Sequence, residues 1–330
     1  MLEQQKNVDE NPLRLVEIPP PQPGPGEIRI RISACGVCHT DLHVVEGDIR
    51  PTRMPIVPGH QIVGRVDAVG EEAKRFAVGD RAGVPWLNWI NPACKDYGTD
   101  RENLCEDIRF TGLNVDGGFA QFIVADERFA YPLPEIFSDV QAAPLLCAGV
   151  IGYRALRLSE IDRGERLGLY GFGASAHVVL QIARHLGKEC YVFTRSPEHR
   201  QMALALGAAW VGGADETPPH KIDSAINFAP VGDLVVRALH VMERGGTVVH
   251  AGIYSTPIPQ FDYRWLYEER TIRSAANSTR RDVQDLLRVA AEIPVHTEVQ
   301  DYPLEDANRA LRDLKHSRIR GAAVLEIGNA

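Results

Sequence analysis

The sequence predicts an α/β protein of two domains, one β-rich and one built on a doubly wound parallel sheet. Its 330 residues exceed what a single hydrophobic core usually holds. Up to about Tyr131, short strand-like segments are interrupted by glycine and proline. From about Leu167, strand and helix patterns alternate, as they do in parallel sheets covered by helices.

The composition excludes several classes of protein. The apolar fraction of 44% and the charged fraction of 24% are those of an ordinary globular protein. A net charge of -8 with interspersed acids and bases argues against nucleic acid or an anionic membrane as the main partner. No apolar run approaches the roughly 20 residues of a membrane span, and the polar segment 1–10 lacks the core of a secretory signal. We expect a cytoplasmic protein.

The first part of the chain predicts strands joined by long functional loops. The proline-rich segment 18–26 reads as an extended connector. Alternation of apolar and polar residues and flanking turn residues predict strands over Glu27–Ser33, Ile62–Val69 and Phe119–Val124.

The rest of the chain predicts alternating helices and strands. The expected helices are Pro144–Leu158, Ala174–Leu186, Pro197–Leu206, Asp233–Met242, Arg281–Ala291 and Leu304–Leu314. The expected strands are Leu167–Tyr170, Cys190–Thr194, Asp223–Phe228, Gly246–Ala251 and Ala322–Ile327. We expect the last 50 or so residues to return to the first domain, although periodicity alone does not show it.

Six cysteines stand at positions 35, 38, 94, 105, 147 and 190. In a large chain without a signal peptide, packing or metal ligation is expected rather than a disulfide framework. Cys38, His60 and Cys147 are the candidate metal ligands, because two thiolates and one imidazole suit Zn²⁺ and leave a fourth position open. We read Cys35 as a packing residue.

A glycine-rich segment follows the expected strand at 167–170 and opens the next helix. Gly171 allows the tight turn, Gly173 lets the backbone approach a pyrophosphate, and Ala176 permits close packing of helix on strand. The helix N-terminus then faces the phosphates of a dinucleotide.

Together these motifs resemble the zinc-containing medium-chain alcohol dehydrogenase family, most closely its cinnamyl-alcohol-dehydrogenase-like bacterial branch. The resemblance spans nearly the whole chain and rests on Gly-Val-Cys-His-Thr-Asp (36–41), Pro-Gly-His (58–60), the turn 77–84, Leu-Cys-Ala-Gly (146–149) and the glycine-rich loop. It implies a GroES-like catalytic domain over 1–148 and 277–330 and a Rossmann domain over 149–276. It further implies hydride transfer between a nicotinamide cofactor and a primary alcohol or aldehyde, with aromatic substrates included, by a homo-dimer or homo-tetramer.

The resemblance also assigns roles. It makes Cys38, His60 and Cys147 the zinc ligands, and it makes Asp41 the carboxylate that orients the ligand histidine. Thr40 matches the hydroxyl that takes the alcohol proton, and His43 the base that relays it through the nicotinamide ribose to solvent. The remaining matches are residues that approach the pyrophosphate, His39 and Arg320, and residues that line the substrate pocket, Trp86, Leu87 and Trp89.

The strand before the second helix of the Rossmann unit decides the cofactor. NAD enzymes place a carboxylate there for the ribose hydroxyls, whereas this chain has Thr194, Arg195 and Ser196, with Arg200 nearby. Because arginine suits a 2′-phosphate, the sequence favours NADP(H) over NAD(H).

Two departures from the family pattern carry expectations of their own. Gln61 stands where the family usually has glutamate behind the zinc, so we expect a more electrophilic zinc and altered ligand exchange. The four cysteine positions of the structural zinc lobe hold Asn91, Cys94, Tyr97 and Cys105. Since two thiolates are missing, we expect one catalytic zinc per subunit and no structural zinc.

Two alternative functions stay open at this point. One is a zinc-free quinone or enoyl reductase of the same fold, which the joint presence of three ligands disfavours. The other is a non-catalytic cofactor-binding protein, because a fold alone does not fix a function. An intact Thr40/His43 pair disfavours it.

Overall fold

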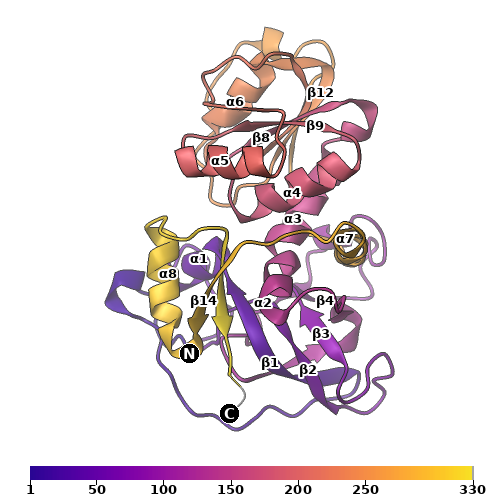
Figure 1. Ribbon diagram of the computed structural model, residues 1–330. Coiled ribbons are helices and arrows are strands. Elements are labelled where there is room, and N and C mark those ends of the chain that lie inside the picture. Colours follow the sequence, from indigo (N-terminus) through magenta and orange to yellow (C-terminus); the bar gives the residue numbers. More distant parts are fainter. Residues whose placement is uncertain (329–330) are drawn as a thin grey trace. The chain divides into compact units, whose positions relative to one another are not determined.

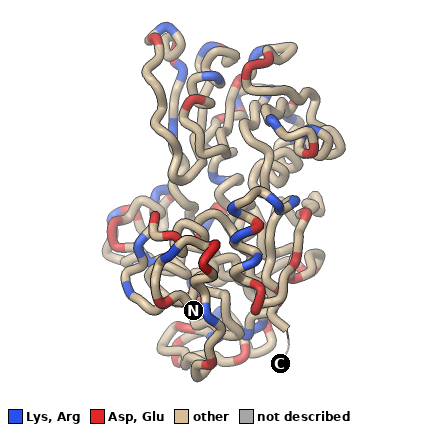
Figure 2. The backbone as a smooth tube through the Cα atoms, turned by 90° about the vertical axis from the view of Figure 1, so that its left-hand side faces the viewer, with Lys and Arg blue, Asp and Glu red and all other residues tan. Residues whose placement is uncertain are grey.

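The computed structural model describes residues 1–328 and divides into two compact units. The first unit comprises Met1–Cys147, Thr279–Ala291 and the chain from His296 onward; the second comprises Ala148–Ser278 and Glu292–Val295 (Figure 1). Acidic and basic residues are interspersed along the backbone of both units (Figure 2). Among the described residues, no helix has the length and apolar character that crossing a bilayer requires.

The first unit is built on a seven-stranded sheet in the order β14-β15-β1-β2-β3-β7, with β6 also paired to β1. Its strands are β1 (Glu27–Val37), β2 (Gln61–Val69), β3 (Arg81–Val84), β6 (Phe122–Asp126), β7 (Tyr131–Pro132), β14 (Val299–Pro303) and β15 (Ala322–Glu326). Its helices are α1 (His39–Glu46), α2 (Asp139–Ala142), α7 (Arg280–Glu292) and α8 (Ala307–Lys315). The C-terminal strands β14 and β15 therefore complete the sheet that the N-terminal strands begin.

The alternation in β1 determines which face of this strand packs on the core. Ile28, Ile30 and Ile32 are buried in one core cluster, while the arginines between them point to the more exposed face. The strand pairs antiparallel with β2, β6 and β15. The apolar period of two thus selects both the strand and the face that packs.

A separate two-stranded sheet belongs to the lobe of the first unit, by which we mean residues 86–110. It pairs β4 (Leu87–Ile90) with β5 (Ile108–Phe110), and the segment between them contains the 3-10 turn Glu102–Leu104. A small core of its own holds it, made of Leu87, Ile90, Cys105 and Phe129.

The second unit is a fully parallel six-stranded sheet in the order β10-β9-β8-β11-β12-β13. Its strands are β8 (Arg166–Tyr170), β9 (Glu189–Phe193), β10 (Trp210–Gly212), β11 (Ile222–Asn227), β12 (Met242–His250) and β13 (Thr271–Ser274). Its helices are α3 (Ala148–Leu158), α4 (Ala174–His185), α5 (Pro197–Ala205) and α6 (Asp233–His240). Strand order reverses between β8 and β11, the position where doubly wound sheets bind ligands.

Two expected helices differ from the structure. The helix expected over Pro144–Leu158 is interrupted at Cys147, which separates the 3-10 turn Ala143–Leu146 from α3. Likewise, Leu304–Asp306 is a 3-10 turn that precedes α8. At the break, the backbone of Cys147 (φ -135°, ψ -72°) lies outside the helical region.

Candidate active site

Strand register brings the first two candidate ligands together. Gly36 of β1 lies opposite Gln61 of β2 in the antiparallel pair, so the end of β1 meets the start of β2. Cys38 follows β1 as the N-cap of α1, and His60 precedes β2. Cys147, from the break before α3, completes the group.

The three ligand atoms form a compact set. Cys38 Sγ and Cys147 Sγ each lie 3.3 Å from His60 Nε2, and the two sulfurs are 3.9 Å apart. These three atoms all lie within 4.8 Å of one another. Zinc bonds of about 2.3 Å to sulfur and 2.1 Å to nitrogen, at tetrahedral angles, place the donor atoms roughly 3.6–3.8 Å apart, within about 0.3 Å of the separations here. The donor set and its spacing therefore fit Zn²⁺.

The carboxylate of Asp41 fixes the ligand histidine. Asp41 is 2% exposed, and its Oδ1 accepts hydrogen bonds from His60 Nδ1 at 3.0 Å and from the Gly59 amide at 3.1 Å. Its Oδ2 accepts the Cys38 amide at 2.9 Å. Since an ionised carboxylate only accepts, His60 carries its proton on Nδ1 and turns the Nε2 lone pair toward the two sulfurs.

The thiols need a compensating cation to ionise. The hydrogen bond with Cys147, followed by burial, raises the pKa of the Cys38 thiol well above its ordinary value. A divalent ion bound between the sulfurs reverses this effect, because metal binding to cysteine displaces the thiol proton.

Helix α1 carries His39, Thr40 and His43 as well as Asp41. Thr40 is buried at 9% exposed, and His43, three residues later, lies on the same face of the helix. His43 Nδ1 pairs with Asp48 Oδ2 at 2.7 Å. Burial, with a smaller contribution from His43, lowers the pKa of His39.

Gln61 lies directly behind the ligand histidine and is 2% exposed. Its side chain fills the space beside Gly36, where an added Cβ would fall 2.7 Å from its amide carbon. Its Nε2 is buried and has no hydrogen-bond partner among the described residues. A neutral amide with a spare donor is thus held where the family pattern has a carboxylate.

The three expected pocket residues do not occupy one environment. The Trp86 ring lies 6.0 Å from the ring of His60 and stacks on Phe110 at 4.2 Å. Leu87 is fully buried in the lobe core. Trp89 packs against the same core, with the guanidinium of Arg109 4.7 Å above its ring. Trp86 thus makes a ring contact with a ligand residue, while Leu87 and Trp89 belong to the lobe core.

The expectation of packing or metal ligation for the cysteines, rather than a disulfide framework, is wrong for one pair. Cys94 and Cys105 are disulfide-bonded across 11 residues, while Cys35, Cys38, Cys147 and Cys190 are free. The physical reason lies in the lobe, where the turn brings the two remaining thiols together. Asn91 stands at the first of the four cysteine positions of the family pattern. Its side chain donates to Asp107 at 2.9 Å and accepts the Ala93 amide.

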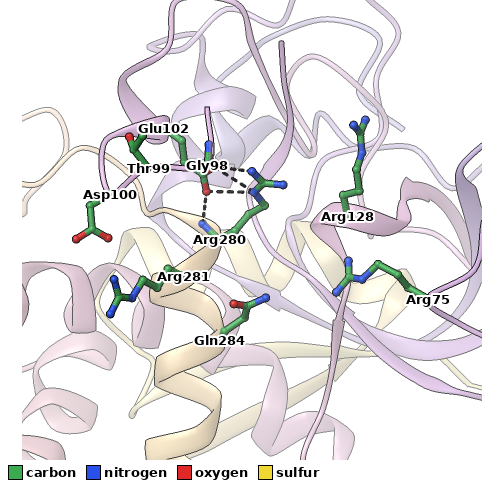
Figure 3. A pocket seen from close by; sticks show the side chains of 9 residues that line it. All are labelled: Arg75, Gly98, Thr99, Asp100, Glu102, Arg128, Arg280, Arg281 and Gln284. Atoms are coloured by element: carbon green, nitrogen blue, oxygen red, sulfur yellow. Dashed lines mark hydrogen bonds and ion pairs between the residues drawn. The ribbon is translucent and has the colours of Figure 1, made fainter. Parts of the chain in front are cut away.

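An ion pair that the sequence did not indicate holds the other side of the lobe. Arg280 at the start of α7 donates to Glu102 at 2.7 Å, and Glu102 is 2% exposed. The same guanidinium donates to Tyr97 Oη at 3.2 Å and lies over the rings of Tyr97 and Phe129. Figure 3 shows Glu102 and Arg280 joined at a pocket of about 740 Å³. Tyr97 therefore joins the lobe to α7 through Arg280.

The disulfide leads to a prediction about thiol count and stability. Titration of the denatured, unreduced protein gives four thiols, and prior reduction gives six, because only Cys94 and Cys105 are paired. A Cys94→Ser/Cys105→Ser variant loses about 3 kcal/mol of unfolding free energy, the loop-closure contribution for a loop of this length. Six thiols without reduction would show that the bond does not form.

The glycine-rich segment adopts the expected strand-turn-helix arrangement in the second unit. Gly171 follows β8 with φ +80°, Gly173 is the N-cap of α4, and Ala176 is fully buried. The amide of Gly171 donates to Phe193 O at the end of β9. The N-terminus of the 12-residue helix α4 thus lies at the C-terminal end of β8, where the strand order reverses.

Two arginines follow β9, and they differ in their contacts. Arg195 is exposed, and no hydrogen bond or ion pair joins its guanidinium to the described residues. Arg200 donates to Thr194 O at 3.0 Å and to Glu216 at 3.2 Å. Ser196 is the N-cap of α5 and accepts the His199 amide. Arg320, in the first unit, is exposed in the bend before β15.

Comparison with known proteins identifies the family. The alcohol dehydrogenase GroES-like domain matches residues 24–135, and the zinc-binding dehydrogenase domain matches residues 176–292. The chain is 47% identical over 326 residues to a probable alcohol dehydrogenase, AdhA, of Mycobacterium tuberculosis, covering 97% of this chain and 94% of that protein. An alcohol dehydrogenase of Geobacillus stearothermophilus is 35% identical, with 96% of both chains covered.

Solved structures agree with the sequence relatives. A cinnamyl alcohol dehydrogenase of Sorghum bicolor superposes with a TM-score of 0.87 at 27% identity, over 98% of this chain and 96% of that one. Its fold joins a GroES-like and a Rossmann domain, as the two units described above do. The chain therefore belongs to the zinc-dependent medium-chain alcohol dehydrogenase family, whose members are NAD(P)-dependent oxidoreductases.

Proposed function

We propose that the protein oxidises primary alcohols, aromatic ones included, and reduces the corresponding aldehydes, with one catalytic zinc per subunit and NADP(H) as the preferred cofactor. The observation that carries the proposal is the spacing of Cys38, His60 and Cys147, whose donor atoms match a tetrahedral zinc site with one position open. In this proposal residues 1–148 and 277–330 hold the metal, and 149–276 hold the dinucleotide. A homo-dimer or homo-tetramer remains part of the proposal.

The chain's own residues supply proton handling and orientation. When bound, zinc would polarise the alcohol oxygen and favour its ionisation. The Thr40 hydroxyl accepts the alcohol proton, and His43 takes it onward because the two side chains share one face of α1. Asp41 keeps His60 in the Nδ1–H tautomer. Trp86, stacked on Phe110, offers an apolar surface beside His60 that suits an aromatic ring.

Benzyl alcohol tests this assignment. NADP⁺-linked oxidation, followed through the reduced nicotinamide, is expected to stop when a chelator removes zinc and to return on addition of Zn²⁺. Turnover that persists in fully chelated protein would favour a zinc-free mechanism. Absence of turnover in zinc-loaded protein with either cofactor would remove the dehydrogenase proposal.

Arg195 is expected to select the phosphorylated cofactor. In Arg195→Ala, KM for NADP⁺ rises roughly tenfold while KM for NAD⁺ changes little, because the exposed guanidinium can meet a 2′-phosphate. Arg264→Ala, another exposed arginine on the same unit, serves as the control. Equal effects on the two cofactors would show that Arg195 does not read the phosphate.

Gln61 is expected to set the pH dependence of the reaction. In Gln61→Glu, a carboxylate replaces the buried amide behind His60 and adds a negative charge near the metal. The pH profile of alcohol oxidation therefore shifts to higher pH, since added negative charge disfavours deprotonation of the bound alcohol. Steady-state rates across pH measure this, and an unchanged profile would rule out an electrostatic role for residue 61.

A further inference from the structure

Asn227 is the last residue of β11, an inner strand of the second unit's sheet, and is fully buried. Its Oδ1 accepts the amide of Ala229 at 3.1 Å, and its Nδ2 donates to Val231 O at 3.0 Å. One side chain therefore forms hydrogen bonds with a backbone N–H and a backbone carbonyl of the turn 228–231 that follows the strand. This is an Asx-type turn with a second bond across it.

These two bonds fix the orientation of the amide and the tautomer of its neighbour. An amide N–H only donates and a carbonyl only accepts, so Oδ1 must face Ala229 and Nδ2 must face Val231. The remaining proton of Nδ2 points at His250 Nδ1, 3.0 Å away. His250 Nδ1 must then accept, which places the proton of the neutral ring on Nε2.

The neutral ring is the form that this environment favours. Burial lowers the pKa of His250. The described residues give its ring one hydrogen-bond partner, Asn227, and its Nε2 none. A proton on Nδ1 would set two donors against each other, so the contact with Asn227 requires the neutral ring.

The turn that this pair holds borders the glycine-rich turn. A Cβ added to Gly171 would fall 3.2 Å from the Ala229 nitrogen, and one added to Gly252 would fall 2.9 Å from Ala229 O. The backbone of Ala229 thus lies between the turns that follow β8 and β12. The Phe228 amide, which donates to Tyr170 O at 2.9 Å, ties the turn to β8 as well.

We propose that Asn227 and His250 are a positioning pair for the dinucleotide: together they hold the turn 228–231 against the glycine turn at Gly171, where the pyrophosphate would lie. The inference rests on the proposed placement of the dinucleotide at Gly171. Neither residue contacts the cofactor in this account. Asn227 shapes the wall of its site, and His250 holds the Asn227 amide in register.

Titration of the purified enzyme with NADPH gives the Kd by which the role of Asn227 and His250 is tested. Asn227→Leu is expected to raise Kd roughly tenfold, because it removes both bonds to the turn. His250→Leu raises Kd several-fold, whereas His250→Asn restores binding because its Oδ1 can accept at the position of Nδ1. The double variant Asn227→Leu/His250→Leu is no weaker than Asn227→Leu alone, since the two residues act through one contact.

Three further measurements separate positioning from general destabilisation. At saturating cofactor, kcat of these variants changes less than about twofold, because the proton-handling residues are in the other unit. Asn308→Leu, which removes a similar pair of side-chain bonds to Leu13 in the first unit, leaves Kd for NADPH unchanged. Nitrogen NMR of His250 shows a protonated Nε2 and an unprotonated Nδ1.

Gly173→Val distinguishes failure of the pair from failure of the placement. If Gly173→Val abolishes NADPH binding but Asn227→Leu and His250→Leu leave Kd within twofold of wild type, the positioning role is wrong. Equal Kd values for His250→Leu and His250→Asn would also overturn it. If Gly173→Val itself leaves Kd unchanged, the dinucleotide does not bind at the glycine turn and the placement is wrong.

Discussion

Cys38→Ala is expected to lose its zinc and nearly all of its activity. The substitution leaves two ligands of three, which cannot close a tetrahedral site around the open position. Because metal polarisation contributes several kcal/mol to the transition state, kcat/KM falls by at least roughly 10³-fold. Metal analysis and alcohol-oxidation kinetics on the same preparation measure both effects.

Cys190→Ala is the matched control for that experiment. Cys190 is a free, buried cysteine of β9 in the second unit, so its removal is expected to cost some stability but no metal. A Cys38→Ala protein that keeps one zinc and wild-type turnover would contradict the assignment of the ligand set. Parallel loss of zinc in Cys190→Ala would mean that the loss reflects unfolding.

Arg280→Met is expected to cause the largest loss of stability among single substitutions in the lobe. It leaves the carboxylate of Glu102, which is 2% exposed, without its charged partner. Breaking a buried pair from one side costs about 3–5 kcal/mol, and the lost cation–π contacts with Tyr97 and Phe129 add to this. Urea unfolding followed by fluorescence gives the difference.

Glu102→Gln and Arg128→Met test whether the large cost of Arg280→Met comes from leaving a buried carboxylate without its charged partner. Glu102→Gln costs less than Arg280→Met, because Arg280 is partly exposed and the amide oxygen still accepts one of the two backbone N–H groups, those of Gly98 and Arg280, which the two carboxylate oxygens accept separately. Arg128→Met removes a more exposed pair with Asp126 and costs less than about 1 kcal/mol. Equal losses of unfolding free energy in Arg280→Met and Arg128→Met would refute a special contribution of the Arg280–Glu102 pair.

The units and their strands could be predicted because their patterns are local. The alternation at Ile28, Ile30 and Ile32 selects β1, and the glycine-rich segment after β8 selects the turn at Gly171. The interruption at Cys147 could not be predicted, because apolar residues on both sides continue a helical pattern. The break places Cys147 Sγ 3.3 Å from His60 Nε2, a contact between residues 87 apart that no local pattern reports.

The ligand set was predictable only through its flanking motifs. Cys38, His60 and Cys147 are far apart in sequence, and each alone is typical of an ordinary packing or turn residue. Strand register joins the first two, and no sequence period reports that register. Asp41 was implied by the resemblance, and its bonds to His60 and Cys38 agree with an orienting role.

The contacts that hold the lobe could not be predicted from the sequence. The missing thiolates at Asn91 and Tyr97 indicated that metal would not hold it, but not what would. The Cys94–Cys105 disulfide and the contact of Tyr97 with Arg280 join segments that the sequence separates by up to 183 residues. Asn227 and His250 gave no sequence signal at all, because their role depends on adjacent positions in two parallel strands.

Metal content of the purified enzyme tests the central claim most directly. Elemental analysis per subunit, made on protein active in NADP⁺-linked benzyl alcohol oxidation, is expected to give one zinc. Two zincs per subunit would contradict the interpretation of Asn91 and Tyr97 and the disulfide at Cys94 and Cys105. No zinc in active protein would contradict the assignment of Cys38, His60 and Cys147 as the catalytic metal site.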